Sequence, residues 1–245
     1  MLAILGGSGL SQLSTLDGVR RKTVQTVYGV PSGPLTLGRI GKRELIFLAR
    51  HGDAHSIPPH QVNYRANIQA LRDAGAKRIA SVATVGGIRR DFGPGTLVVP
   101  DQIIDYTWGR ASTFFEGQGA KVTHIDFTEP YSAALRNDIL AAAKACGEAV
   151  ADGGCYGATQ GPRLETAAEI ARMERDGADL VGMTAMPEAA LAREAGLEYA
   201  AIAVVANHAA GKGDSAHVIS LTAIDAVVEQ AMQRVQRILE RLAAS

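Results

Sequence analysis

The stretch that decides the fold runs from Thr159 to Thr166, with the letters TQGPRLET, and resumes from Gly182 to Glu188, with the letters GMTAMPE. Its Gly-Pro turn delivers Leu164 and Glu165 to the start of an expected helix. That helix is expected to end near Gly177, because glycine is a usual helix stop. The turn therefore opens a turn–helix–strand unit.

The strand of this unit is expected at residues 179–181, which are largely apolar, with Met183 and Thr184 at its carboxyl end. In open α/β sheets, ligands bind outside the carboxyl ends of the strands. The unit collects an apolar side chain, a carboxylate, a thioether and a hydroxyl, a set that suits a flat, partly polar molecule. A structural interpretation stays open, since the helix dipole also favours an acidic residue such as Glu165 at a helix N-terminus.

The whole chain has the length and composition of a globular protein. Its 245 residues, 47% of them hydrophobic and 20% charged, fit a single domain spanning residues 1–245. The 25 basic residues balance the 25 acidic ones, so no attraction to nucleic acid or to an anionic membrane is expected. Aromatic residues make up 5%, which also disfavours a base-stacking surface.

Targeting signals and cysteine chemistry point to the cytoplasm. No apolar run approaches the roughly 20 residues of a membrane span, and the apolar start at residues 1–5 is too short for a signal peptide. Cys146 and Cys155 have neither metal-ligand spacing nor the density of a disulfide scaffold. We therefore expect a cytoplasmic protein with two core thiols.

Strand-like and helix-like patterns alternate along the chain. Strands are expected at residues 2–5, 35–40, 44–49, 79–82, 96–99, 155–158, 179–181 and 199–206. Helices are expected at residues 62–71, 132–146, 165–177, 188–196 and 224–242, and a loop at residues 101–119. This alternation predicts an α/β fold in which helices flank a central twisted, mostly parallel mixed sheet.

Two strand ends near the N-terminus are candidate anion sites. The turn at residues 6–10, with the letters GGSGL, can offer backbone N–H groups and the Ser8 hydroxyl to a phosphate. A dinucleotide-binding loop is disfavoured, because the third glycine of G-x-G-x-x-G is missing. Arg50 and His51 follow the strand at 44–49, and a guanidinium suits bidentate binding of an oxyanion.

The histidines after Arg50 allow two other interpretations. Arg-His-Gly after a strand resembles the histidine phosphatases, but that family places the motif after its first strand and needs a second catalytic histidine. A metal site from His51, His55 and His60 is disfavoured, because prolines interrupt the segment and no Cys or Glu completes a ligand set.

Two later strand ends complete the list of candidates. Residues 83–88, with the letters ATVGGI, are expected to form a turn that approaches an anion or a planar ring closely. Asn207 follows the strand at 199–206, and its amide both donates and accepts, as reading a base edge requires. An Asx turn at the strand end is the alternative for Asn207.

Five stretches, in this order along the chain, resemble the trimeric purine nucleoside phosphorylases and methylthioadenosine phosphorylases. They are residues 6–10 (GGSGL), 50–52 (RHG), 62–67 (VNYRAN), 159–163 (TQGPR) and 182–188 (GMTAMPE). The resemblance covers nearly the whole chain. It implies a nucleoside phosphorylase-like fold, a homotrimer, and cleavage of a nucleoside by inorganic phosphate as co-substrate, without a metal or an organic cofactor.

The resemblance also implies the site residues. The phosphate site would comprise Ser8, Arg50, His51, the backbone at Thr84 and the hydroxyl of Thr184, while Ala83 departs from a hydroxyl residue found in some members. The base and ribose would be bound by Val85, Gly86, Leu164 and Met183. Leu164 replaces the usual Phe, which keeps an apolar face but loses ring stacking.

The expected catalytic residues, Asn207 and Glu165, indicate an oxopurine base. Adenine-cleaving members carry Asp at the end of the last strand and again two residues on, where this chain has Asn207 and Ala209. An ionised Glu165 would accept from the N1–H of a 6-oxopurine and repel the N1 lone pair of adenine, while the Asn207 amide donates to N7 or O6. Leaving such buried groups unpaired discriminates by up to about 10⁴-fold.

The 5′ side of the substrate indicates a methylthio group. Residues 122–125 (VTHI) resemble the segment with which methylthioadenosine phosphorylases close a neighbouring subunit's 5′ pocket, so His124 is expected to reach a neighbouring active site. The pocket lining would be Val218, Ser220, Leu221 and Ile224, unless His217 contacts a 5′-hydroxyl. The expected substrate is 5′-methylthioinosine. The alternatives are inosine or guanosine, methylthioadenosine, or a non-catalytic nucleoside-binding role that the phosphate residues argue against.

Overall fold

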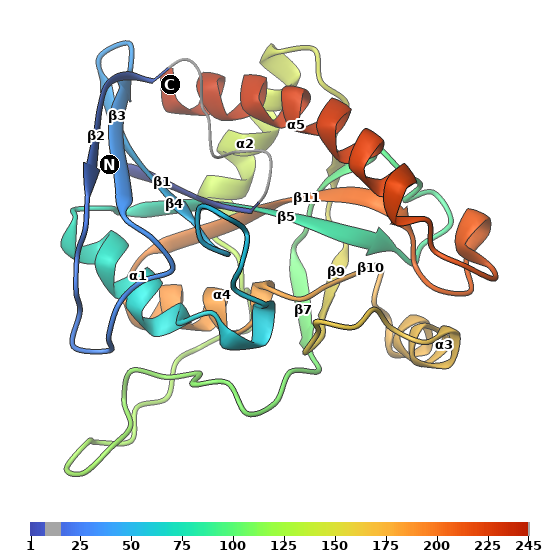
Figure 1. Ribbon diagram of the computed structural model, residues 1–245, viewed down its shortest axis with the longest axis horizontal. Coiled ribbons are helices and arrows are strands. Elements are labelled where there is room, and N and C mark those ends of the chain that lie inside the picture. Colours follow the sequence, from blue (N-terminus) through green and yellow to red (C-terminus); the bar gives the residue numbers. More distant parts are fainter. Residues whose placement is uncertain (8–15, 245) are drawn as a thin grey trace.

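The computed structural model describes residues 1–7 and 16–244, and within these ranges eleven strands form one mixed sheet (Figure 1). The strands are β1 (Leu2–Gly6), β2 (Asp17–Lys22), β3 (Leu35–Ile40), β4 (Arg43–Ala49), β5 (Arg78–Gly87), β6 (Leu97–Val99), β7 (Gln102–Asp105), β8 (Ala151–Asp152), β9 (Cys155–Ala158), β10 (Leu180–Gly182) and β11 (Glu198–His208). The helices are α1 (Tyr64–Asp73), α2 (Ala133–Ala145), α3 (Ala167–Asp176), α4 (Ala185–Glu194) and α5 (Leu221–Ala244).

Strand β5 organises the sheet because it has three partners. Along one edge it pairs in parallel with β11 over its whole length. Along the other edge it pairs first with β1, through Ser81, and then with β10, from Gly86. Residues 82–85 therefore have no strand partner on that second edge among the described residues, and the sheet divides there.

Helices cover both faces of the sheet, with α2 and α5 on one side and α1 and α4 on the other (Figure 1). Alternate residues of each strand feed the two cores. Ile4 and Ile202, for example, pack with the α2 and α5 residues Leu135 and Val235. Leu5 and the α1 residue Ile68 belong to the opposite core. Each face of the sheet therefore packs against its own apolar core.

Local sequence explains where α3 begins and ends. The Thr166 side chain accepts from the Glu169 N–H, and the Glu169 carboxylate accepts from the Thr166 N–H, which completes a capping box. Gly177 ends the helix in the left-handed conformation, at φ 96°. The helix predicted between Glu165 and Gly177 is thereby confirmed, as is the buried strand that follows it.

The predicted fold class is confirmed, but two local predictions are wrong and strand β2 was missed. The turn expected at residues 83–88 is the second half of β5, which continues to Gly87. The loop expected at 101–119 begins with a strand, β7. Strand β2 was not predicted, because its six residues are all exposed and carry no apolar pattern. No helix in the described part of the chain is long and apolar enough to cross a membrane.

Candidate active site

A cavity of about 650 Å³ lies where the sheet divides, and the carboxyl ends of several strands open into it. Its wall includes Gly7 after β1, Arg50 and His51 after β4, and the unpaired stretch of β5. The segment after β10 contributes Met183 and Thr184, and the end of β11 contributes Asn207. Segments far apart in the sequence thus meet at one point.

The unpaired edge of β5 supplies backbone groups to this cavity. The Arg50 Nη1 atom donates to the carbonyl of Val82 at 3.0 Å, so Val82 presents its backbone to the gap between β1 and β10. Backbone groups alternate between the two edges of a strand. Thr84, two residues further on, therefore turns its N–H to the same gap, where the N–H is available to an anion.

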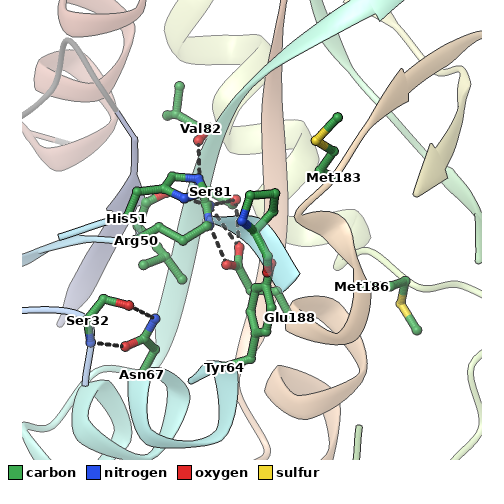
Figure 2. A network of polar contacts seen from close by, with 12 residues as sticks. Ser32, Arg50, His51, Tyr64, Asn67, Ser81, Val82, Met183, Met186 and Glu188 are labelled. Atoms are coloured by element: carbon green, nitrogen blue, oxygen red, sulfur yellow. Dashed lines mark hydrogen bonds and ion pairs between the residues drawn. The ribbon is translucent and has the colours of Figure 1, made fainter. Parts of the chain in front are cut away.

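Most N–H groups of the Arg50 guanidinium are hydrogen-bonded to other groups of the protein (Figure 2). Its Nε and Nη2 atoms donate to the two carboxylate oxygens of Glu188, at 2.6 and 2.9 Å. Nη2 also lies 2.7 Å from the Ser81 hydroxyl. The expected bidentate binding of an oxyanion is therefore wrong: the carboxylate of Glu188 takes that position. Among the residues that the structure describes, Nη1 has one partner, the carbonyl of Val82, so its second N–H remains for a ligand.

Arg50 and Glu188 form a buried ion pair, with side chains 1% and 0% exposed. Glu188 also accepts from the hydroxyls of Ser81 and Tyr199, at 2.9 and 2.7 Å. Burial alone would lower the pKa of Arg50, but the adjacent Glu188 raises it above its ordinary value. The cavity therefore has in its lining a guanidinium of fixed position whose charge is balanced by Glu188. Sequence reasoning missed Glu188 as a partner, although it lies in the quoted GMTAMPE stretch.

His51 is held in one tautomer beside Arg50. Its Nδ1 atom lies 2.8 Å from the carbonyl oxygen of Ile57, which only accepts, so Nδ1 carries the proton and Nε2 has the lone pair. Burial, reinforced by the positive charge of Arg50, lowers the pKa of His51 to about 4. The imidazole is therefore neutral at physiological pH.

The carboxylate and the amide expected to face a base also line the cavity. Glu165 accepts from the Thr159 hydroxyl at 2.6 Å, which fixes one carboxylate oxygen. Asn207 donates to the carbonyl of His208 at 2.6 Å. The pairing of β11 with β5 slips between Val205 and Asn207. Such a bulge re-aims side chains, and here both Ala206 and Asn207 reach the cavity.

Gly161 is required by the close packing around Met183. Its φ is 62°, and a Cβ atom there would lie 2.5 Å from Met183 Sδ and 2.9 Å from Pro59 Cγ. The turn at Gly161 therefore lets Met183 and Pro59 approach each other along the cavity wall. Leu164 also lines the cavity, although 43% of it is exposed.

The structure brings most of the predicted site residues together around one cavity. These are Arg50, His51, Thr84, Val85, Gly86, Leu164, Glu165, Met183, Thr184 and Asn207. Ser8 lies outside the described residues. The described residues hold no group of three or more His, Cys, Asp or Glu side chains that could bind a metal.

The predicted 5′ pocket is placed differently. Ile224 lines the cavity as expected, but Ile219 and Met232 take the places foreseen for Val218, Ser220 and Leu221. Val218 and Leu221 are instead 74% and 66% exposed. The residues before α5 have no apolar periodicity, so the sequence did not reveal which of them point inward. His124 is exposed in the segment between β7 and α2, and it does not line this chain's cavity.

Comparison with known proteins identifies the family. The model of the phosphorylase superfamily matches residues 1–244. This chain belongs to the phosphorylase superfamily.

Relatives within the superfamily include proteins named for S-methyl-5′-thioinosine and proteins named for 6-oxopurine nucleosides. The chain is 61% identical, over 87% of its length and 86% of the relative's, to a probable S-methyl-5′-thioinosine phosphorylase of Xanthomonas campestris pv. campestris. It is 46% identical, over 86% of its length and 80% of the relative's, to the 6-oxopurine nucleoside phosphorylase of Pyrococcus furiosus.

Among solved structures, the methylthioadenosine phosphorylase of Schistosoma mansoni in complex with adenine matches with a TM-score of 0.94. That match covers 99% of this phosphorylase and 90% of the other chain, at 32% identity. The predicted nucleoside phosphorylase-like fold is therefore confirmed.

Proposed function

We propose that this phosphorylase cleaves S-methyl-5′-thioinosine with inorganic phosphate, giving hypoxanthine and 5-methylthioribose 1-phosphate. The carbon–nitrogen bond to the base lengthens first, and the ribosyl carbon becomes cationic. Phosphate bound beside Arg50, His51, Thr84 and Thr184 stabilises that cation and then captures it. The negative charge that develops on the departing base is stabilised by donors at its edge.

The observation that carries this proposal is that Glu165 and Asn207 both line the cavity. A carboxylate held by Thr159 accepts from the N1–H of an oxopurine but faces only a lone pair in adenine. The Asn207 amide, unlike an Asp carboxylate, donates to N7 or O6 of the base. The names of the relatives, which refer to methylthioinosine or 6-oxopurine nucleosides, support the same base.

Three apolar side chains support the methylthio half of the proposal. Ile219, Ile224 and Met232 line the cavity, and their side chains offer no hydrogen-bond partner to a 5′-hydroxyl. A thioether methyl group buried there gains about 25 cal/mol for each Å² removed from water. We therefore propose these three side chains as the 5′ pocket within one subunit. The reaction as written needs no metal and no organic cofactor, because phosphate is the nucleophile.

We propose that the active protein is a cytoplasmic homotrimer in which His124 of one subunit closes the 5′ pocket of the next. The segment that carries His124 projects from the body of the molecule in Figure 1. It exposes large apolar side chains, with Trp108 72% and Val122 74% exposed. Light scattering should give three times the chain mass of 25.7 kDa. A monomer with full activity would contradict the shared pocket.

Inosine or guanosine phosphorolysis is the second candidate, favoured by the relatives named for 6-oxopurine nucleosides. Methylthioadenosine phosphorolysis follows, favoured by the solved structures of similar fold.

The proposed reaction is tested by incubating the protein with S-methyl-5′-thioinosine with and without phosphate. Hypoxanthine and a sugar 1-phosphate should appear in equal amounts, and only when phosphate is present. Base release without phosphate would indicate a hydrolase, and no release in either case would end the proposal.

A further inference from the structure

Arg110 lies on the projecting segment after β7, yet its side chain reaches back to the cavity wall. Its Nη1 atom donates to the carbonyls of Met183 and Met186, at 2.8 and 2.6 Å. Its Nη2 atom donates to the carbonyls of Thr159 and Gln160, at 3.1 and 2.8 Å. One guanidinium therefore binds the two stretches that carry the base and ribose residues.

A third part of the wall is tied to the same group. Nη1 lies 3.2 Å from the hydroxyl of Tyr64, which itself donates to the carbonyl of Pro59 at 2.9 Å. Pro59 lines the cavity. Figure 2 shows Tyr64, Met183 and Met186, the three residues bound by Nη1 of Arg110, near the Arg50 network.

The partners of Arg110 are unusual for an arginine. Within residues 1–7 and 16–244, no carboxylate forms an ion pair with it, and its acceptors are four backbone carbonyls, the Tyr64 hydroxyl and the Gln160 side chain. Backbone carbonyls offer no charge neutralisation, so this arrangement fixes the backbone that carries them. Each of those carbonyls stands within a few residues of Glu165, Met183 or Thr184.

We propose that Arg110 is a positioning residue for the phosphorylase reaction: its guanidinium sets the distance between the Glu165 wall and the Met183–Thr184 wall. The inference rests on the proposed function, since it concerns the same cavity. Thr159 connects Arg110 to the base-binding carboxylate. Its hydroxyl donates to Glu165, and its carbonyl accepts from Arg110. Met183 links it to the ribose in the same way.

The planar fork of arginine is specific for this role. Five N–H groups in a fixed plane reach acceptors on both walls at once, whereas a lysine ammonium is a compact charge with three donors. Lysine at position 110 would keep the positive charge but could not donate to the acceptors on both walls at once. Charge alone is therefore not expected to restore activity.

The test compares Arg110→Ala, Arg110→Lys and the wild type in the phosphate-dependent assay. A displacement of about 1 Å costs about 100-fold in rate, so kcat of Arg110→Ala should fall by about that factor and the KM for the nucleoside should rise. Added guanidinium at millimolar concentration should restore part of the activity of Arg110→Ala, but not that of Arg110→Lys. The exposed Arg172, replaced by Ala, is the matched control and should neither lose activity nor respond to guanidinium.

A second readout keeps the inference separate from the substrate assignment. Hydrogen exchange of the backbone amides at residues 159–165 and 183–187 should become faster in Arg110→Ala, whichever nucleoside is turned over. Wild-type protein without phosphorolysis, together with faster exchange in the variant, would contradict the proposed function alone. Unchanged exchange, with kcat and KM within twofold of wild type, would overturn the role of Arg110. So would an activity loss that guanidinium does not reverse and that follows a fall in Tm.

Discussion

At the scale of single residues, the site depends on charges held by neighbours inside the protein. Arg50 is 1% exposed, and most of its N–H groups donate to Glu188, to Ser81 and to backbone carbonyls. The guanidinium therefore cannot swing toward a ligand. It is a hydrogen-bond donor of fixed position whose charge Glu188 balances, and phosphate must fit the N–H of Nη1 that remains among the described contacts.

Replacing Glu188 with Gln should destabilise the protein strongly. Removing one partner of a buried ion pair leaves an uncompensated charge, which costs about 3–5 kcal/mol. The free energy of unfolding, measured with urea, should fall by that amount. Asp91→Asn, which breaks an exposed contact with Arg89, is the control and should leave the urea midpoint nearly unchanged. Equal effects of the two substitutions would refute the account of Arg50.

His51 should make stability depend on pH between about 4 and 6.5. Its pKa is about 4 in the folded protein, against an ordinary value of 6.5. Between these values the unfolded chain binds a proton that the folded protein does not, so stability falls as the pH is lowered. His51→Asn removes this difference, and urea titrations at several pH values should show a shallower pH dependence in the variant. The same pH dependence of stability in the variant and the wild type would show that the pKa of His51 is not lowered in the folded protein.

At the scale of elements, most strands and helices could be predicted, because their apolar periodicity and end signals are local. The second half of β5 is one exception. The letters TVGG in β5 indicate a turn when taken alone, but these glycines serve close packing inside a strand. A Cβ atom at Gly87 would lie 1.8 Å from the carbonyl oxygen of Phe92. That requirement depends on a residue from another turn, so no local pattern reveals it.

The turn at Gly161 supports a prediction at this scale. Alanine there would have an unfavourable positive φ and would press on Met183 and Pro59. Gly161→Ala should therefore lower kcat about 100-fold through a misplaced Met183, while circular dichroism shows a folded protein. Gly75→Ala also changes a glycine with positive φ, but open space surrounds it, so its kcat should match wild type. Full activity of Gly161→Ala would contradict the packing described for Met183.

At the scale of the whole molecule, the active site exists because the sheet divides at β5. The candidate residues at the ends of β4 and β11 could be predicted to meet, since these strands run parallel and their carboxyl ends share one edge. Met183 and Thr184 reach the same cavity for another reason, because β10 runs antiparallel to β5 and its chain enters from the opposite direction. The 5′ pocket could not, because its inward residues, Ile219 and Ile224, depend on how the irregular segment before α5 folds back. The role of His124 depends on a second subunit and stays a prediction.

The central claim is that one cavity selects an oxopurine base and a methylthio group together. It is tested most directly by kcat/KM for S-methyl-5′-thioinosine, inosine and methylthioadenosine, measured side by side at one phosphate concentration. We predict the highest value for S-methyl-5′-thioinosine and the lowest for methylthioadenosine, by up to about 10⁴-fold. Asn207→Asp should raise kcat/KM for methylthioadenosine relative to kcat/KM for S-methyl-5′-thioinosine, and so reduce the difference between them. A wild-type preference for methylthioadenosine would contradict the roles assigned to Glu165 and Asn207, and a preference for inosine would contradict the 5′ pocket.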